Sequence, residues 1–358
     1  MPPDPYKLLA ERLDALPNGF PPTADGAELR LLAKLFTPEE ALLACQLRLT
    51  PETPAQIAAH AGGKPAQVRK QLKEMARRGL ISLERAEGGL GYKLMPFVVG
   101  IYEMQGDRID AELAQLFEDY YKQSFATALA VQPQFHRVIP VNETVKVGIE
   151  IHPYESAAEI INAAQAWGVT DCICRKQKAL IGESCAHPLD VCMVLNSTPG
   201  VFDNNTTVRA LTHQGALDTL QRAAKSGLVH SVSNNQRGTW YICNCCTCSC
   251  GILRGIAELG LANVVARSAF VNQVNEELCI ACGDCADACQ FSAMTVATVS
   301  QVNPIKCVGC GVCVIACPED ALELIRRSAE EVQPPPETGD DWLVARAAAR
   351  GLPMNSIL

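Results

Sequence analysis

The stretch Cys279-Ile-Ala-Cys282-Gly-Asp-Cys285-Ala-Asp-Ala-Cys289 decides how the C-terminal part of this 358-residue chain folds. The same C-x2-C-x2-C-x3-C spacing returns at Cys307-Val-Gly-Cys310-Gly-Val-Cys313-Val-Ile-Ala-Cys317-Pro318. Three thiolates spaced in this way can surround one face of a cubane of four irons and four sulfides. The sequence therefore predicts two [4Fe–4S] clusters.

In paired motifs the fourth cysteine ligates the other cluster. The first cluster is therefore assigned Cys279, Cys282, Cys285 and Cys317, and the second is assigned Cys307, Cys310, Cys313 and Cys289. Residues 270–326 resemble the bacterial-type ferredoxin with two [4Fe–4S] clusters, and structural zinc sites are the alternative interpretation. Gln290 stands where the first motif usually has proline, so we expect a less rigid turn after Cys289 but no lost ligand.

Composition and charge narrow the class of protein. Hydrophobic residues make up 48% of the chain and charged residues 20%, as in a soluble globular protein. A net charge of −8 argues against a nucleic-acid coat protein. The 18 cysteines gather in short motifs, which is typical of a metal-loaded cytosolic protein rather than a small disulfide scaffold. With no secretory signal and no apolar run of about 20 residues, a cytoplasmic protein without a membrane span is predicted.

Helix signals are dense near the N-terminus. Three helix starts are predicted, at Thr37-Pro38, Thr53-Pro54 and Lys64-Pro65. The last of these helices should end at Gly79, and a hairpin is predicted around Glu87-Gly88-Gly89. This order of helices and hairpin resembles the winged helix-turn-helix fold of bacterial regulators.

The last of these helices has a basic face that could contact a partner protein or DNA. Its members are Lys64, Arg69, Lys70, Lys73, Arg77 and Arg78. We favour a protein partner, because a chain of net charge −8 repels DNA at long range. Cys45, alone on an apolar helix, is interpreted as a core residue.

The connector that follows is predicted from its apolar pattern. It should contain an amphipathic helix at 108–130, a β-branched extended stretch at 138–151, and a helix at 156–167.

Nine further cysteines lie in the middle of the chain and are expected to bind metal. They are Cys172, Cys174, Cys185, Cys192, Cys243, Cys245, Cys246, Cys248 and Cys250. Soft thiolates select iron–sulfur clusters, zinc or Cu(I), and beside two predicted cubanes we favour one or two more iron–sulfur clusters. Either each sequence group, 172–192 and 243–250, holds its own cluster, or the two groups combine around one and leave spare thiols.

Two neighbours of these cysteines, and the direction of one cysteine among them, could shape the sites. Cys246 should face away from Cys243, Cys245 or both, because alternate residues of an extended chain point to opposite sides. Arg175 could neutralise cluster charge or simply form an ion pair, and His187 could ligate iron but more often such a residue forms hydrogen bonds.

The order of motifs along the chain is similar to that of a known family. Before the ferredoxin motifs come Pro96-Phe-Val-Val-Gly-Ile-Tyr-Glu, then Cys172-x-Cys-Arg, then Cys243-Asn-Cys-Cys-x-Cys-x-Cys. The family is that of the poorly characterised 4Fe–4S dicluster-domain proteins of anaerobic bacteria. Members often have cysteine at the position of Ser249, so the resemblance implies that this position is no essential ligand. The family implies iron–sulfur electron transfer and little about a substrate.

The predicted fold class is α+β, with an N-terminal winged helix-turn-helix, a central cysteine-rich α/β region and a C-terminal two-cluster ferredoxin fold. The expected boundaries are 1–27 for a Pro-rich, mostly irregular arm with a helix at 6–15, 28–100 for the winged helix, 101–166 for the connector, 167–267 for the cysteine-rich region, 268–328 for the ferredoxin domain, and 329–358 for a linker and helix. The last helix, at 340–350, should dock on its own domain.

Three functions remain open at this point. The first is an electron carrier or subunit that serves a larger oxidoreductase, which the acidic residues of the ferredoxin region favour because they could dock basic partners. The second is a redox-responsive DNA-binding regulator, and the third is a reductase whose substrate binds an incompletely ligated middle cluster. Neither a phosphate-binding loop nor a Gly-rich dinucleotide turn is found, so a stand-alone enzyme is less expected.

Overall fold

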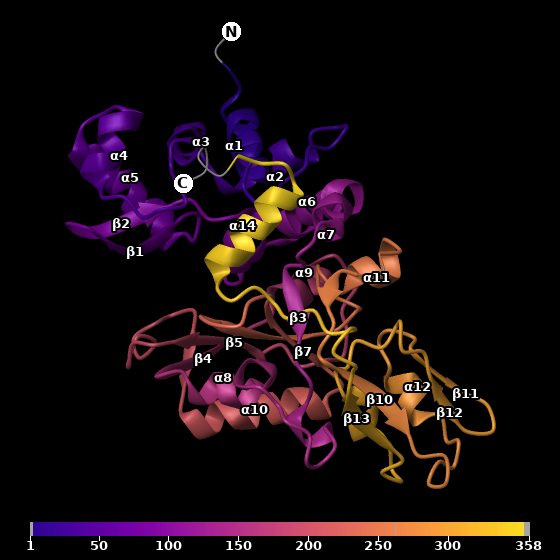
Figure 1. Ribbon diagram of the computed structural model, residues 1–358. Coiled ribbons are helices and arrows are strands. Elements are labelled where there is room, and N and C mark those ends of the chain that lie inside the picture. The colour runs from indigo at the N-terminus through magenta and orange to yellow at the C-terminus, as the bar shows by residue number, and fades with distance from the viewer. Residues whose placement is uncertain (1–2, 262, 354–358) are drawn as a thin grey trace. The chain divides into compact units, whose positions relative to one another are not determined.

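The computed structural model describes residues 3–261 and 263–353, which form two compact units. The first unit comprises the chain up to Gln132 together with the residues from Leu343 on, and the second is Pro133–Trp342. Both mix helices and strands, in agreement with the expected mixed class (Figure 1). Among the described residues, no helix is both long and apolar enough to cross a bilayer.

The first unit is mostly helical, with one antiparallel hairpin. Its elements are α1 (Pro5–Asp14), α2 (Ala27–Leu35), α3 (Pro38–Cys45), α4 (Pro54–Ala61), α5 (Pro65–Arg77), β1 (Ser82–Ala86), β2 (Gly89–Lys93), α6 (Ala111–Tyr120) and α7 (Ala126–Ala130). The predicted helix starts are confirmed: Thr37 and Thr53 cap α3 and α4, each in a capping box closed by the residue three positions on.

The N-terminal arm agrees with expectation, because the helix predicted at 6–15 is present as α1 and residues 15–26 are irregular. The arm also contributes to the core of this unit: Leu9, Leu13 and Leu16 are buried, and the ring of Phe20 lies 4.7 Å from that of Phe97. One expectation needs correction, since Cys45 is only half-buried and is not a full core residue.

The C-terminal helix α14 (Gly339–Ala349) packs within the first unit from Leu343 on. The guanidinium of Arg346 is fully buried and donates hydrogen bonds to the backbone carbonyls of Pro17, Ala128 and Val131. The prediction that this helix docks on the protein itself is confirmed by these contacts.

A seven-stranded sheet forms the middle of the second unit, in the order β6-β4-β5-β8-β7-β3-β9. All neighbours are antiparallel except β3 and β9. The strands are β3 (His136–Val138), β4 (Ala166–Thr170), β5 (Cys192–Asn196), β6 (Arg209–Leu211), β7 (Val229–Ser233), β8 (Tyr241–Cys245) and β9 (Val265–Ala266), and the helices are α8 (Ala157–Asn162), α9 (Ile173–Leu180), α10 (His213–Lys225) and α11 (Arg254–Glu258).

The connector predictions were only partly right. The helix predicted at 108–130 is present as α6, a π-helical turn at Tyr121–Phe125, and α7. The extended stretch predicted at 138–151 is wrong beyond Val138, because only β3 is a strand there. The helix predicted at 156–167 ends at Asn162, and Trp167 lies on β4.

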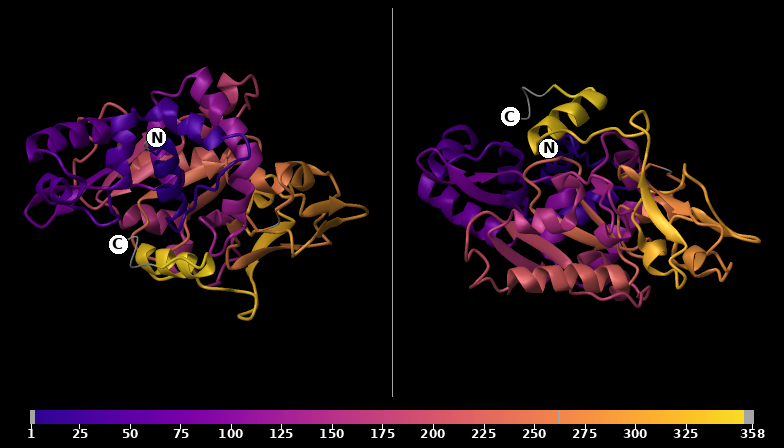
Figure 2. Two further views of the ribbon diagram at one scale, coloured as in Figure 1. Left: turned by 90° about the horizontal axis from the view of Figure 1, so that it is seen from above. Right: turned by 60° about the horizontal axis from the view of Figure 1, so that its bottom comes forward.

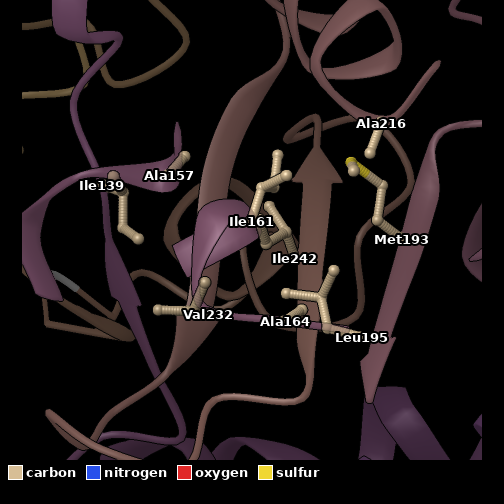
Figure 3. Close-up of a cluster of buried hydrophobic side chains, with 9 residues drawn as sticks. All are labelled: Ile139, Ala157, Ile161, Ala164, Met193, Leu195, Ala216, Val232 and Ile242. Carbon is tan, nitrogen blue, oxygen red and sulfur yellow. The ribbon is translucent and has the colours of Figure 1, made fainter. Parts of the chain in front are cut away.

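Helices α8 and α10 cover one face of this sheet (Figure 1). Figure 3 shows the apolar core between these helices and the sheet. There, Met193 and Leu195 of β5 pack with Ile242 of β8 and Ile161 of α8. Side chains alternate across a strand. Cys192, Cys243 and Cys245 therefore point to the opposite face, away from this core.

The two ferredoxin-like motifs lie in small elements beside this sheet (orange to yellow in Figure 2). These are β10 (Phe270–Val274), α12 (Asp284–Ala288), β11 (Met294–Val296), β12 (Ser300–Val302), α13 (Val312–Ile315) and β13 (Leu322–Arg326). Strand β10 pairs with β13 and β11 with β12, both antiparallel. The backbone N–H of Val141 donates to the carbonyl of Cys310, which joins this part to the rest of the second unit.

Candidate metal centres

The first predicted quartet lines one recess. Cys279, Cys282, Cys285 and Cys317 lie around it. Cys285, on α12, is buried, whereas Cys282 is exposed. The Oγ of Ser300 lies 3.2 Å from the Sγ of Cys285, and the Ser300 N–H donates to Cys279 Sγ at 3.3 Å. Such donors stabilise thiolate ligands and tune a cluster's potential.

The second quartet, Cys289, Cys307, Cys310 and Cys313, is more enclosed, since Cys307 and Cys313 are buried. Burial, together with the charges of Cys307 and Cys289, raises the pKa of Cys310 to about 12. The Cys310 thiol therefore remains protonated without metal, and cluster binding must release its proton. This crowding of buried thiols fits a cluster better than free cysteines.

Two donors at the second quartet were missed by sequence reasoning. Asn272 Nδ2 donates to Cys313 Sγ at 3.0 Å, and the Ala293 N–H donates to Cys289 Sγ at 3.3 Å. Neither residue lies in a cysteine motif, so only the pairing of β10 with β13 brings Asn272 close. Gly309 is required by close packing, because a Cβ there would lie 2.1 Å from the carbonyl oxygen of Phe270.

Six of the nine middle cysteines form one group, in which each thiol interacts with the next around a ring. In ring order they are Cys172, Cys174, Cys250, Cys245, Cys243 and Cys192. We call this group the six-thiol centre. It draws on both middle sequence groups and on two layers of the fold, a helix end and a sheet.

The sheet register explains why these residues meet. Met193 of β5 is paired with Ile242 of β8, so the next positions, Cys192 and Cys243, are neighbours across the strands. Cys172 is the N-cap of α9. Hydrogen bonds from Cys174 and Cys192 lower the pKa of Cys172 well below its usual value. A thiolate at a helix N-terminus is favoured electrostatically.

The other middle cysteines belong to a second, compact group. Its members are Cys185, His187, Cys246 and Cys248, whose ligand atoms all lie within 4.8 Å of one another. Burial alone would raise the pKa of Cys185, but hydrogen bonds involving Ser249 and His187 lower it to about 6. Cys246 lies in this group and Cys243 and Cys245 in the six-thiol centre, in agreement with the prediction that Cys246 faces away from Cys243, Cys245 or both. The six-thiol centre combines both sequence groups and leaves three thiols outside it, which agrees with the second of the two partitions considered from the sequence.

Arg175 serves both groups. Its buried guanidinium donates to the backbone carbonyls of Pro188 and Asn244, at 2.9 and 2.6 Å. Burial opposes its charge, yet the thiolates of Cys172 and Cys246 raise the pKa of Arg175 above its usual value. Of the two roles considered, charge neutralisation of thiolates is the one that these contacts support.

Gln290 connects the ferredoxin-like motifs to the middle cysteines. Its Oε1 accepts a hydrogen bond from the Thr247 N–H at 2.7 Å, and its Nε2 donates to the carbonyl of Gly227. Thr247 lies between Cys246 and Cys248, and Gln290 follows Cys289 directly. Gln290, which stands where the motif usually has proline, thus links the loop after Cys289 to the loop of Cys246 and Cys248 by hydrogen bonds.

The basic face predicted in the first unit lies on α5 and its N-cap. Lys64, Arg69, Lys70 and Lys73 are exposed. Arg77 forms an ion pair with Glu74 at 2.7 Å, and Arg78 forms one with Glu40 at 2.7 Å, so these two are less available to a partner.

Comparison with known proteins supports the C-terminal sites. Residues 272–295 and 300–323 match the family described as the 4Fe-4S binding domain. Searches of curated proteins and of solved structures found no match. The matched segments contain all eight cysteines of the two quartets. The match and the further cysteine clusters together indicate an iron–sulfur electron-transfer protein.

Proposed function

We propose that this protein delivers electrons to a larger oxidoreductase, with the first quartet facing the partner and the six-thiol centre holding a further iron–sulfur cluster. Bound [4Fe–4S] clusters would supply one-electron transfer. The chain's own residues provide ligands, N–H···S and O–H···S hydrogen bonds, and a docking surface.

The observation that carries this proposal is the surface around the first quartet. Cys282 is exposed, and the side chains of Leu278 and Ile280 are 47% and 62% exposed beside it. Six exposed carboxylates lie within the two cysteine motifs or no more than three residues from them: Glu276, Glu277, Asp284, Asp287, Glu319 and Asp320. An apolar centre fringed by acidic groups suits a basic partner, because opposite charges steer the encounter.

An electron acceptor of opposite charge tests this surface. Reduced protein would be mixed anaerobically with the basic acceptor cytochrome c, and the rate of its reduction measured at several ionic strengths. The variant Glu276→Gln/Glu277→Gln/Glu319→Gln should react about tenfold more slowly at low salt, and the difference should vanish at high salt.

The matched control is Glu11→Gln/Glu39→Gln/Glu87→Gln, which removes three exposed carboxylates of the first unit. It should react like the wild type. Equal slowing by both variants would show that only net charge matters, and would contradict a docking surface at the first quartet.

The exposed basic face of α5 supports a second contact. We propose that residues 28–100 act as a winged-helix module that docks a protein, with DNA binding as the rival function. Replacing Arg69, Lys70 and Lys73 by alanine should then release a co-purifying protein. If the module binds DNA instead, the wild type will bind a promoter fragment with a steep salt dependence. The slope of that dependence will fall in the variant by about 0.9 for each phosphate that is no longer neutralised.

A further inference from the structure

The geometry points to a separate single-ion site of the zinc type, formed by Cys185, His187, Cys246 and Cys248. This inference goes beyond electron transfer, because Zn²⁺ has no redox chemistry in proteins. It assigns the compact group a structural role distinct from that of the six-thiol centre.

Spacing is the first argument. All four ligand atoms lie within 4.8 Å of one another, and His187 Nδ1 lies 3.8 Å from Cys248 Sγ. Zn–S bonds of about 2.3 Å in a tetrahedron place two sulfur ligands about 3.8 Å apart. A cluster of several irons holds its ligands on different metals and so spreads them more widely. Among the described residues, neither ferredoxin-like quartet forms so compact a group.

Ligand chemistry is the second argument. Three sulfurs and one imidazole nitrogen form one of the common structural zinc sets. The ligands come in two pairs, Cys185 with His187 and Cys246 with Cys248, each separated by a single residue. The polypeptide therefore approaches the ion from two sides, and the four positions of a tetrahedron are filled.

The surroundings support a bound ion. Ser249 Oγ donates to Cys185 Sγ at 3.4 Å, which is the kind of outer hydrogen bond that orients a ligand. Cys246 is buried and Cys248 is exposed, so the ion would have a path of entry. Three thiolates and Zn²⁺ carry a net charge of −1, and the cationic Arg175 interacts with the Cys246 thiolate.

A metal here would fasten two distant segments of the chain. It would also fix the loop that carries Thr247, whose N–H is held by Gln290 next to a ligand of the second quartet. The single-ion site therefore acts as a clip that positions the ferredoxin-like part against the cysteine-rich sheet.

Metal analysis of anaerobically purified full-length protein tests this inference. We expect about one zinc per chain, and zinc K-edge X-ray absorption should show three sulfur ligands and one nitrogen. Cys248→Ala and His187→Ala should each lose most of the zinc while iron and acid-labile sulfide stay unchanged. The control Cys45→Ala, which removes a half-buried thiol of the first unit, should keep its zinc.

The variants also separate this inference from the proposed function. Cys174→Ala, in the six-thiol centre, should lower iron and leave zinc in place. If Cys248→Ala loses iron and sulfide instead of zinc, the compact group is a cluster site and the inference is wrong. Zinc bound by four sulfurs in the wild type would overturn it as well, even if a variant failed to fold.

Discussion

The two cysteine regions of the second unit assemble their sites in opposite ways. Each ferredoxin-like quartet takes three ligands from one short loop and a fourth from the other motif. The six-thiol centre instead takes two ligands from the start of α9, three from strands β5 and β8, and one from the turn before α11. Loop geometry positions the first kind of site, and strand register positions the second.

This difference has a physical consequence. A loop site can be lost without disturbing the seven-stranded sheet, because none of its ligands lies on a strand of that sheet. A site built on strands depends on the register of β5 and β8, and in turn links them to α9. The middle centre should therefore be coupled to the stability of the sheet, whereas the quartets should not.

The largest effect is expected from removing a strand-borne ligand. Cys243→Ser should abolish the middle iron centre and increase amide hydrogen exchange in β5 and β8. Cys282→Ser should remove the first quartet's cluster but leave exchange in the seven-stranded sheet unchanged. If Cys243→Ser kept its full iron content, the six-thiol centre would not be an iron site.

The next largest effect is expected from alanine substitutions at two glycines, one in each cysteine motif. Gly309→Ala would push a methyl group to within 2.1 Å of the Phe270 carbonyl, so we expect a loss of about 3 kcal/mol of stability and of the second quartet's cluster. Gly283→Ala meets no atom within 4 Å and only strains a φ of +97°.

Gly283→Ala should therefore lose only about 1 kcal/mol and keep its iron. Iron content and thermal unfolding of the two anaerobic proteins check the pair. Equal losses would mean that backbone conformation, and not packing against Phe270, sets the need for glycine.

The sequence predicted the quartets better than the middle centre, because the quartets are built on loops and the middle centre on strands. The quartets follow from spacing alone, because their ligands are local. The grouping of Cys172 with Cys243 could not be predicted, since it depends on a pairing of β5 with β8 that no local pattern specifies. Asn272 and Ser300 were missed because a single donor beside a thiolate leaves no motif. The core contacts of the N-terminal arm show the same limit, because they are made with residues far along the chain.

A smaller difference between the seven-stranded sheet and the ferredoxin-like part is expected in how their stability responds to acid. Burial lowers the pKa of His136 on β3 and of His230 on β7 to about 4, and the ferredoxin-like part contains no histidine. The unfolded chain takes up these protons near pH 6.5, so stability is full above that pH and is lost as pH falls toward 4. We expect each histidine to remove about 2 kcal/mol from the opening free energy of β3 and β7 at pH 5.

Hydrogen exchange of wild type and His136→Asn between pH 7 and pH 5 measures this effect. The variant should show a shallower pH dependence in β3, while β10 and β13 should respond equally in both proteins. The same pH dependence in β3 of both proteins would contradict the assignment to His136.

The smallest effect concerns the hydrogen bonds between the two regions. Gln290→Ala removes the acceptor of the Thr247 N–H and should reduce stability by about 1 kcal/mol. It should also slow electron exchange between the middle centre and the quartets, which flash photoreduction would measure. Gln273→Ala, at an exposed position on β10, is the control. Equal rates in the two variants would show that Gln290 does not position the regions.

The central claim is that the middle cysteines add an iron–sulfur centre to the two of the ferredoxin-like part. Iron and acid-labile sulfide per chain, determined on anaerobically purified wild-type protein, test it most directly. Four of each per cluster predict about twelve irons and about twelve sulfides. About eight of each, with full occupancy of both quartets shown by electron paramagnetic resonance, would contradict this claim.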